Sequence, residues 1–140
     1  MVPRSLFAGL IVLGVGAWLM FQDVSKPPYS LSHIEIAQTT TAHTQGLSGR
    51  EVIEEDFGML FIFPKEGDYG FCMKDMLIPI DIVWLSNTGV VLGIEDSVSP
   101  SSYPQLLYPP QPVKYVLETK AGTAQKRGWD IGTVLTLPLP

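Results

Sequence analysis

The sequence predicts a mainly β protein: a compact single-domain sandwich or partly open barrel of about seven short strands with two short helices, preceded by one transmembrane helix. Three observations predict this class. Short β-branched or alternating runs are separated at close spacing by Gly, Pro and Asn turn signals. The first twenty-odd residues supply much of the apolar weight of the chain. Charged residues are only 16% of the total, against roughly 25% in ordinary soluble domains.

Each predicted strand rests on a local pattern. Residues 34–37 alternate between apolar and polar, and the polar residues 39–45 are expected to continue that strand at a sheet edge. Residues 78–85 (IPIDIVWL) are β-branched and aromatic, which is typical of a central strand buried on both faces. Ser86-Asn87-Thr88-Gly89 then predicts a hairpin turn into an antiparallel strand over 90–94. The other predicted strands are 59–63, 71–73, 113–119 and 134–137.

Two short helices and one long loop complete the prediction. Ser48 and Glu51 have the spacing of a capping box, which predicts a helix from residue 49 to about 55. Residues 121–127 are predicted to form the second helix, ended by a glycine. Residues 97–112 contain five of the twelve prolines, so they are expected to form a stiff surface loop and no central strand.

The amino-terminal part predicts a membrane anchor. Residues 6–21 are sixteen uncharged residues, which as a helix would span ~24 Å and nearly cross a ~30 Å hydrocarbon core. No small-residue cleavage site follows, so residues 1–21 are predicted to be an uncleaved signal anchor and not a signal peptide. Arg4 favours a cytoplasmic amino terminus, with everything after residue 21 outside a single-pass cytoplasmic-membrane span. Residues 22–33 are a Pro-containing linker, and residues 34–140 are the β domain.

Composition excludes several function classes. The net charge of −5 argues against a nucleic-acid partner, which requires a basic surface. The single cysteine, Cys72, has mostly apolar neighbours and is expected to be buried and inert, without a disulfide or a cysteine-based zinc site. His33 and His43 lie on separate polar stretches, so no metal site is predicted. No phosphate-binding loop or nucleophile elbow is present, so no cofactor is predicted either.

Six short blocks follow one another in a characteristic order: 44–50 (TQGLSGR), 58–63 (GMLFIF), 73–76 (MKDM), 78–82 (IPIDI), 115–118 (YVLE) and 121–122 (AG). Together they resemble the domain-of-unknown-function 192 family over roughly residues 34–137. The resemblance implies a small, mainly β bacterial or archaeal domain, often behind a signal or anchor segment, with no established activity. That family usually has Trp where this chain has Cys72, and Asn-Thr is common where this chain has Asp75-Met76. If position 72 lines a groove, the groove of this chain is wider or different.

Asp81 and Glu118 are the candidate functional carboxylates. Each lies in an apolar strand, where an ionised side chain is costly unless it is paired or hydrogen-bonded. Two such groups with separated pKa values can serve as acid and base, as they do in glycosidases. The alternative is that each carboxylate accepts hydrogen bonds from backbone amides and fixes a turn.

Five more side chains are candidates for ligand binding: Met73, Lys74, Asp75, Tyr103 and Tyr108. The first three directly precede the central strand, where Lys74 and Asp75 are alternatively a solvated pair of turn charges. The two tyrosines lie among the prolines of the 97–112 loop. There they would either stack on a sugar or peptide or cover one end of the sheet.

Three functions are consistent with these residues. The first is a non-catalytic module, held on the outer face of the membrane, that binds a small molecule, glycan or peptide. The second is a hydrolase of cell-envelope polymers that uses Asp81 and Glu118. The third is a structural accessory subunit of a membrane complex, which would expose a large apolar patch.

Overall fold

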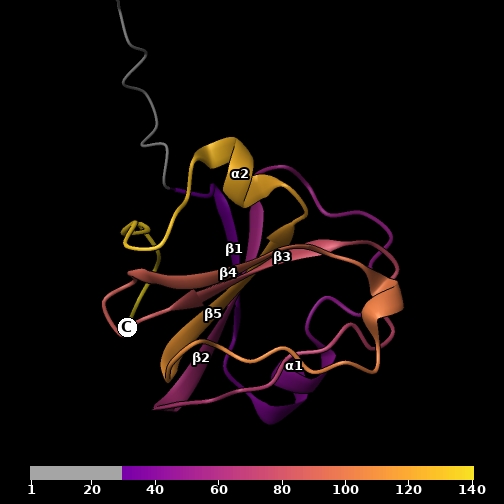
Figure 1. Cartoon of the computed structure of the whole chain (residues 1–140), viewed down its shortest axis with the longest axis horizontal. Helices are drawn as coiled ribbons and strands as arrows, with labels where there is room; N and C mark the ends of the chain where they lie inside the picture. The colour runs from indigo at the N-terminus through magenta and orange to yellow at the C-terminus, as the bar shows by residue number, and fades with distance from the viewer. Residues whose placement is uncertain (1–29) are drawn as a thin grey trace, which may run out of the picture.

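The computed structural model describes residues 30–140, whose five strands form one open sheet. The strands are β1 (His33–Ala37), β2 (Phe57–Gly67), β3 (Ile80–Leu85), β4 (Val91–Val98) and β5 (Val113–Lys120). Their order across the sheet is β1-β2-β5-β3-β4 (Figure 1). β1 and β2 are parallel, whereas every other neighbouring pair is antiparallel.

The connections follow from these pairings. Parallel neighbours cannot be joined by a tight turn, so the chain leaves β1, forms α1 (Thr40–Gln45) and returns through an irregular stretch to β2. The predicted Ser86–Gly89 hairpin turn does join β3 to β4. Its Ser86 hydroxyl oxygen accepts hydrogen bonds from the amides of Thr88 and Val90, and Gly89 has a φ of +79°. The predicted loop over 97–112 begins within the last two residues of β4, and between β4 and β5 the chain forms only a short 3-10 helix, η1 (Pro100–Ser102), and the bridge from Leu107 to Phe71.

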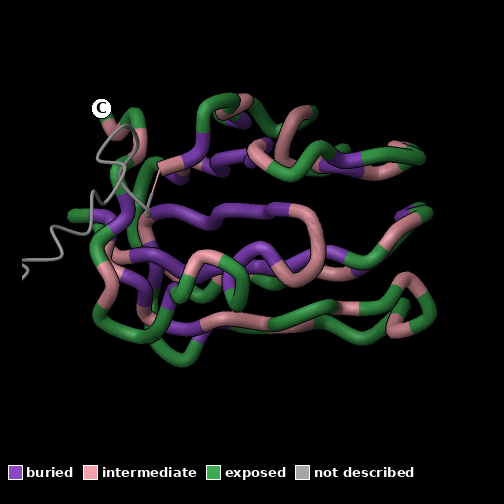
Figure 2. Tube along the Cα trace, turned by 90° about the horizontal axis from the view of Figure 1, so that it is seen from above, coloured by how far each residue is buried: buried purple, intermediate pink, exposed green. Residues whose placement is uncertain are grey.

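The sheet separates two hydrophobic cores. On the face that we call the α1 face, the strands contribute Met59, Phe61, Phe63, Ile82, Trp84 and Val116. On the opposite face, the α2 face, they contribute Leu60, Val83, Leu85, Tyr115 and Leu117, which pack with α2 (Thr123–Arg127) and the carboxyl-terminal segment. The buried stretches run through the interior of the molecule, and exposed segments surround them (Figure 2). All six residues of β3 are buried, which confirms the prediction of a strand covered on both faces.

The prediction of about seven strands in a sandwich or barrel is wrong, because the described residues form five strands in one sheet. Two of the predicted strands form only isolated bridges: Phe71 pairs with Leu107, and Val134 pairs with Val90. A β-branched or apolar run becomes a strand only where a partner lies alongside its whole length, and here the partners are single residues.

The first predicted helix is also wrong. The 39–45 stretch, predicted to extend an edge strand, forms α1 from Thr40 onward, and Thr39 caps the helix by accepting a hydrogen bond from the Ala42 amide. The predicted helix over 49–55 does not form, because the Ser48 hydroxyl, instead of capping it, donates to the Lys74 carbonyl at 2.8 Å. The second predicted helix is confirmed as α2, which ends at Gly128 in the left-handed conformation.

No helix within residues 30–140 has the length and apolar character needed to cross a membrane. The predicted anchor at residues 6–21 and most of the 22–33 linker lie outside the described residues.

Candidate functional site

A pocket of about 320 Å³ opens on the α1 face. Its wall consists of residues 43–48 from α1 and the following turn, Phe61 and Phe63 from β2, and residues of the 69–76 segment. Glu118 of β5 is the one carboxylic acid among the described lining residues. The volume lies near the lower end of the roughly 300–1,000 Å³ that is typical of small-molecule sites.

Gly46 shapes the pocket where α1 ends. Its φ of +49° and ψ of −133° are a backbone conformation that residues with a Cβ rarely adopt, and its amide donates to the Ala42 carbonyl. A Cβ at this position would lie 3.3 Å from the ring of Phe61 and 3.4 Å from Glu118 Oε2. The glycine therefore both ends the helix and leaves space next to the buried carboxyl group.

His43 belongs to the aromatic part of the pocket. Its Nε2 lies 2.9 Å from the Ala37 carbonyl oxygen, and its ring centroid lies 4.6 Å from that of Phe63. His33, by contrast, packs edge-on against Phe57 at the start of β1. In the described part of the chain, no three His, Cys, Asp or Glu side chains are grouped closely enough to hold a metal ion.

The 69–76 segment forms the opposite wall and is fixed from two sides. Phe71 exchanges backbone hydrogen bonds of 2.9 and 2.8 Å with Leu107 of the proline-rich loop. On the other side, the Gly49 amide donates to the carbonyl of Asp75, a residue whose φ is +56°. Tyr69 stacks on Phe63 with a centroid separation of 3.6 Å. These contacts hold the wall against the turn that follows α1, against β2 and against the 97–112 loop.

Glu118 is buried without full hydrogen bonding. It is 6% exposed, and its Oε2 atom has no hydrogen-bond partner. Burial raises the pKa of this carboxyl group to about 8, and a hydrogen bond from the Leu47 backbone amide only partly opposes that rise. The group is therefore mainly a neutral acid at pH 7, able to donate a hydrogen bond into the pocket.

Asp81 is fully buried but fully bonded. Its Oδ1 accepts hydrogen bonds from the amides of Ser97 at 2.9 Å and Gly122 at 3.0 Å, and its Oδ2 accepts from the Ala124 amide at 2.9 Å. Gly122 is the N-cap residue of α2 and has no side chain to cap the helix. The Asp81 carboxylate therefore caps α2 from β3. This is the alternative to acid–base catalysis given above, in which the carboxylate accepts hydrogen bonds from backbone amides.

The structure does not bring Asp81 and Glu118 together. In the β3–β5 pairing, Asp81 lies opposite Thr119 and Glu118 lies opposite Ile82. Because successive side chains of a strand point to opposite faces, Asp81 lies on the α2 face and Glu118 on the α1 face. A glycosidase pair needs both carboxyl groups at one cleft, and the sheet separates these two.

The other predicted residues are divided between core and surface. Lys74 lines the pocket, Met73 is buried in the core of the α1 face, and Asp75 is exposed. Tyr103 and Tyr108 are exposed on the 97–112 loop. Tyr108 lies against the backbone of Gly70, a pocket residue: a Cβ there would be 2.9 Å from the tyrosine ring.

Cys72 is half-buried and lines the pocket, so the expectation of a buried cysteine is corrected. Its small side chain lies where the resemblance suggests a tryptophan. Sequence reasoning missed His43, Gly46 and the phenylalanines of β2 as site residues. The one available signal was the 44–50 block, since the pocket uses its glycine at position 46.

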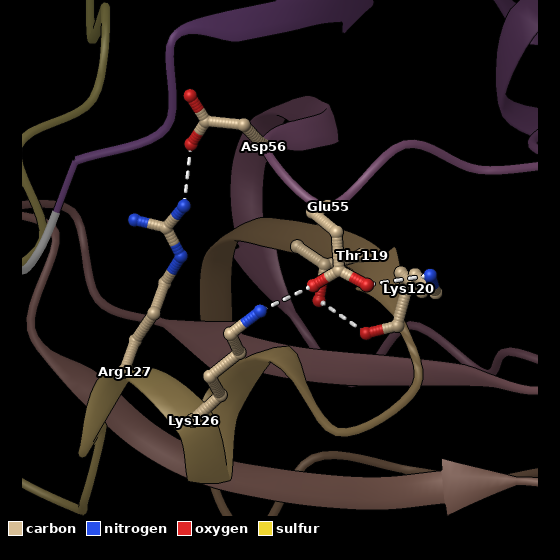
Figure 3. A network of polar contacts seen from close by, with 6 residues as sticks. All are labelled: Glu55, Asp56, Thr119, Lys120, Lys126 and Arg127. Atoms are coloured by element: carbon tan, nitrogen blue, oxygen red, sulfur yellow. Dashed lines mark hydrogen bonds and ion pairs between the residues drawn. The ribbon is translucent and has the colours of Figure 1, made fainter.

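A second group of polar contacts holds α2 to the turn before β2 (Figure 3). Glu55 accepts hydrogen bonds from Lys120 at 2.6 Å and Lys126 at 2.8 Å, and Arg127 pairs with Asp56. The Lys120 and Lys126 ammonium groups lower the pKa of Glu55 to about 2. Because most of these side chains are solvent-exposed, we assign the network a structural role in positioning α2.

These features define a class: a small, mainly β domain with a single open sheet and an aromatic pocket that contains one buried acid. The chain belongs to the DUF192 family, described as "Uncharacterized ACR, COG1430", whose profile matches residues 24–137. No curated protein matches the chain.

Two crystal structures are similar to it. One is a Sinorhizobium meliloti 1021 protein described as "a putative transcription regulator", with 30% identity, a TM-score of 0.68, and coverage of 71% of this chain and 76% of that one. The other is a Novosphingobium aromaticivorans protein of unknown function, with 27% identity, a TM-score of 0.67, and coverage of 71% and 70%.

Proposed function

We propose that this protein is a non-catalytic module that binds a small organic molecule in the pocket on the α1 face. One observation carries the proposal: Glu118 lines this pocket with an unpartnered, buried Oε2. Buried polar atoms in folded proteins nearly always have a partner, and an unpartnered one costs about 1–3 kcal/mol. A ligand that supplies the missing partner recovers that cost.

The rest of the pocket suits the same function. Phe61, Phe63 and Phe71 present apolar surface, and rings of this kind supply most of the contact area in small-molecule sites. Binding is favoured over hydrolysis because Asp81, the second acid of the predicted pair, serves α2 on the other face of the sheet. The ligand would therefore have an apolar part between the rings and one polar group at Glu118.

A glycan or peptide longer than the pocket would extend over the proline-rich loop. Tyr103, Leu106 and Tyr108 are exposed there, and Tyr108 lies against the pocket residue Gly70. Exposed aromatic side chains next to a pocket offer stacking surface to a sugar ring.

We also propose that residues 6–21 anchor the chain in the cytoplasmic membrane and display the pocket on its outer side. The uncharged run and Arg4 before it support this placement. A reporter that is active only outside the cytoplasm, fused at the carboxyl terminus, is expected to be active. Activity from a cytoplasm-only reporter at the same position would contradict the orientation.

The binding function is tested by a fragment screen on the full-length chain, read by ligand-observed NMR and by thermal shift. We expect hits that the Cys72→Trp variant loses, because an indole at that position occupies the pocket that the cysteine leaves open. The matched control is Val52→Trp, which adds the same group at an exposed position away from the pocket. Hits that survive Cys72→Trp unchanged, or a screen without hits, would refute the proposal.

A further inference from the structure

The pocket contains an acid without a matching cation. Most basic side chains elsewhere in the described chain have other partners: Arg50 pairs with Glu35, Lys120 and Lys126 with Glu55, and Arg127 with Asp56, while Lys114 donates to the Pro64 carbonyl. Lys65 is exposed and does not line the pocket. Lys74 lines the pocket, but it is exposed, and within residues 30–140 no ion pair to Glu118 is formed. Within the described residues, no cation of the protein itself thus serves as a partner for the buried Oε2 atom of Glu118.

The walls around this acid are aromatic. His43, Phe61, Phe63, Tyr69 and Phe71 all line the pocket, and neighbouring rings in this group have centroids 3.6 to 6.4 Å apart. The faces of aromatic rings carry partial negative charge and attract ammonium groups, most strongly where water is excluded. The rings, and Glu118 whenever it is ionised, therefore favour positive charge at the same place.

We infer that the ligand is a small organic cation, whose ammonium group lies against Glu118 and the surrounding aromatic rings. This inference rests on the proposed binding function and adds the chemical class of the ligand. An organic anion would place like charge beside Glu118 whenever that group is ionised. The net charge of the chain, −5, also favours the approach of cations over anions.

The protonation of Glu118 makes the inference measurable. Burial raises the pKa of Glu118 to about 8 in the free protein, so a cation that binds below this pH must release the proton. The affinity of a permanent cation is then expected to fall by about tenfold for each pH unit below 8. A neutral ligand that accepts a hydrogen bond from the protonated acid would show the opposite dependence.

Other titratable groups line the same pocket and have to be separated from Glu118. They are His43 on α1 and Tyr69, Cys72 and Lys74 on the opposite wall, while the β2 residues that line it are phenylalanines. Replacing Glu118 alone distinguishes its proton from theirs. Glu118→Gln keeps the shape of the side chain and removes its titration.

The experiment compares three molecules of nearly the same shape with the full-length chain. They are choline, 3,3-dimethyl-1-butanol, in which carbon replaces the charged nitrogen, and the anion 3,3-dimethylbutanoate. Calorimetry between pH 6 and pH 9, in buffers of different ionisation enthalpy, gives both the affinity and the number of protons released. We expect choline to bind at least tenfold more tightly than the neutral alcohol at pH 8, with release of up to one proton at pH 6.5.

The variants make the result specific. Glu118→Gln is expected to remove the preference for the cation and the proton release, and Phe71→Leu to weaken choline binding by removing one ring. Glu66→Gln makes the same acid-to-amide change at an exposed position outside the pocket and is expected to behave as wild type.

Each outcome decides between the two claims. If the alcohol or the anion binds as tightly as choline, the cation inference is wrong while the binding function stands. If none of the three binds but the fragment screen yields pocket ligands that are not cations, the inference again fails alone. If the screen also yields no pocket ligands, both fall together.

Discussion

Asp81 and Glu118 lie on neighbouring central strands, one residue apart in register, yet the two faces of the sheet give them opposite environments. On the α2 face, three backbone amides point at Asp81, and the carboxylate holds the start of α2. On the α1 face, Glu118 receives a hydrogen bond from the Leu47 amide and keeps one oxygen without a partner. Burial alone therefore does not determine what a carboxyl group does; the number of donors aimed at it does.

The two short helices also contribute differently to their faces of the sheet. α2 is attached to the sheet by a buried carboxylate and, at the surface, by the Glu55 and Asp56 ion pairs. α1 has no buried residues and instead ends in a glycine that leaves space beside Glu118. One face of the sheet is thus closed by polar bonds, while the other retains an opening. Substitutions on the two faces are therefore expected to differ in sign and in size.

Glu118→Gln is expected to change the pH dependence of stability most. The pKa of this group is 4.5 in the unfolded chain and about 8 in the folded protein, so between these values folding retains a proton that unfolding releases. The contribution of Glu118 to the free energy of unfolding is therefore greatest below pH 4.5, and it falls by ~1.4 kcal/mol per pH unit until pH 8. At pH 9 we expect the variant to be more stable than wild type by about 4 kcal/mol, measured by urea unfolding. A difference in stability between the variant and wild type that stays the same from pH 5 to pH 9 would contradict this expectation.

Asp81→Asn is expected to have the opposite effect and to lower the stability of the protein. The amide nitrogen that replaces one carboxylate oxygen cannot accept a hydrogen bond from a backbone amide, and the remaining bonds lose their charge assistance. We expect a loss of about 3 kcal/mol at pH 7, together with faster hydrogen exchange at the Gly122 and Ala124 amides. A variant as stable as wild type would show that α2 does not depend on this cap.

Gly46→Ala tests the space beside Glu118. The alanine would have to adopt an unfavourable backbone conformation and would place its Cβ 3.3 Å from Phe61. We expect a loss of about 2 kcal/mol in urea unfolding and weaker binding of any pocket ligand. The control is Gly49→Ala, which also has positive φ but no atom within 4 Å of the added Cβ, so the loss of ligand binding is expected only at position 46.

Lys126→Met is expected to have the smallest effect. It removes one of the two lysines that contact Glu55 (Figure 3), and the three side chains are between 43% and 70% exposed. The change in the unfolding midpoint should be close to the detection limit and should vanish in 0.5 M NaCl, because salt screens surface ion pairs. A large loss that persists in high salt would mean that the network does more than position α2.

The strands that were predicted correctly are those whose local pattern agrees with their environment. β3 is β-branched and aromatic, and it lies inside the sheet between β5 and β4 with every residue buried. The 71–73 and 134–137 runs have a similar local character, but they meet only single-residue partners. The capping-box spacing at Ser48 failed because the Lys74 carbonyl, distant in sequence, takes the serine hydroxyl.

The candidate site was predicted in part. Glu118 and Lys74 were identified from their charge and position, and the structure places both at the pocket. His43 was considered only as a metal ligand, because nothing nearby in the sequence shows that its ring lies beside Phe63. The remaining walls come from segments that are brought together only when α1 and the 69–76 segment pack over the same face.

The amino-acid sequence was sufficient to predict that two carboxylates lie within apolar strands, because the hydrophobic pattern shows which segments are buried. It also determined the hairpin after β3 and the glycine that ends α2, since turn and cap preferences are local. The pairing of Ile82 with Glu118, and with it the face that each acid occupies, follows only from the folded structure. Strand register depends on contacts between distant segments, and a shift of one residue between β3 and β5 would have placed both acids on the same face.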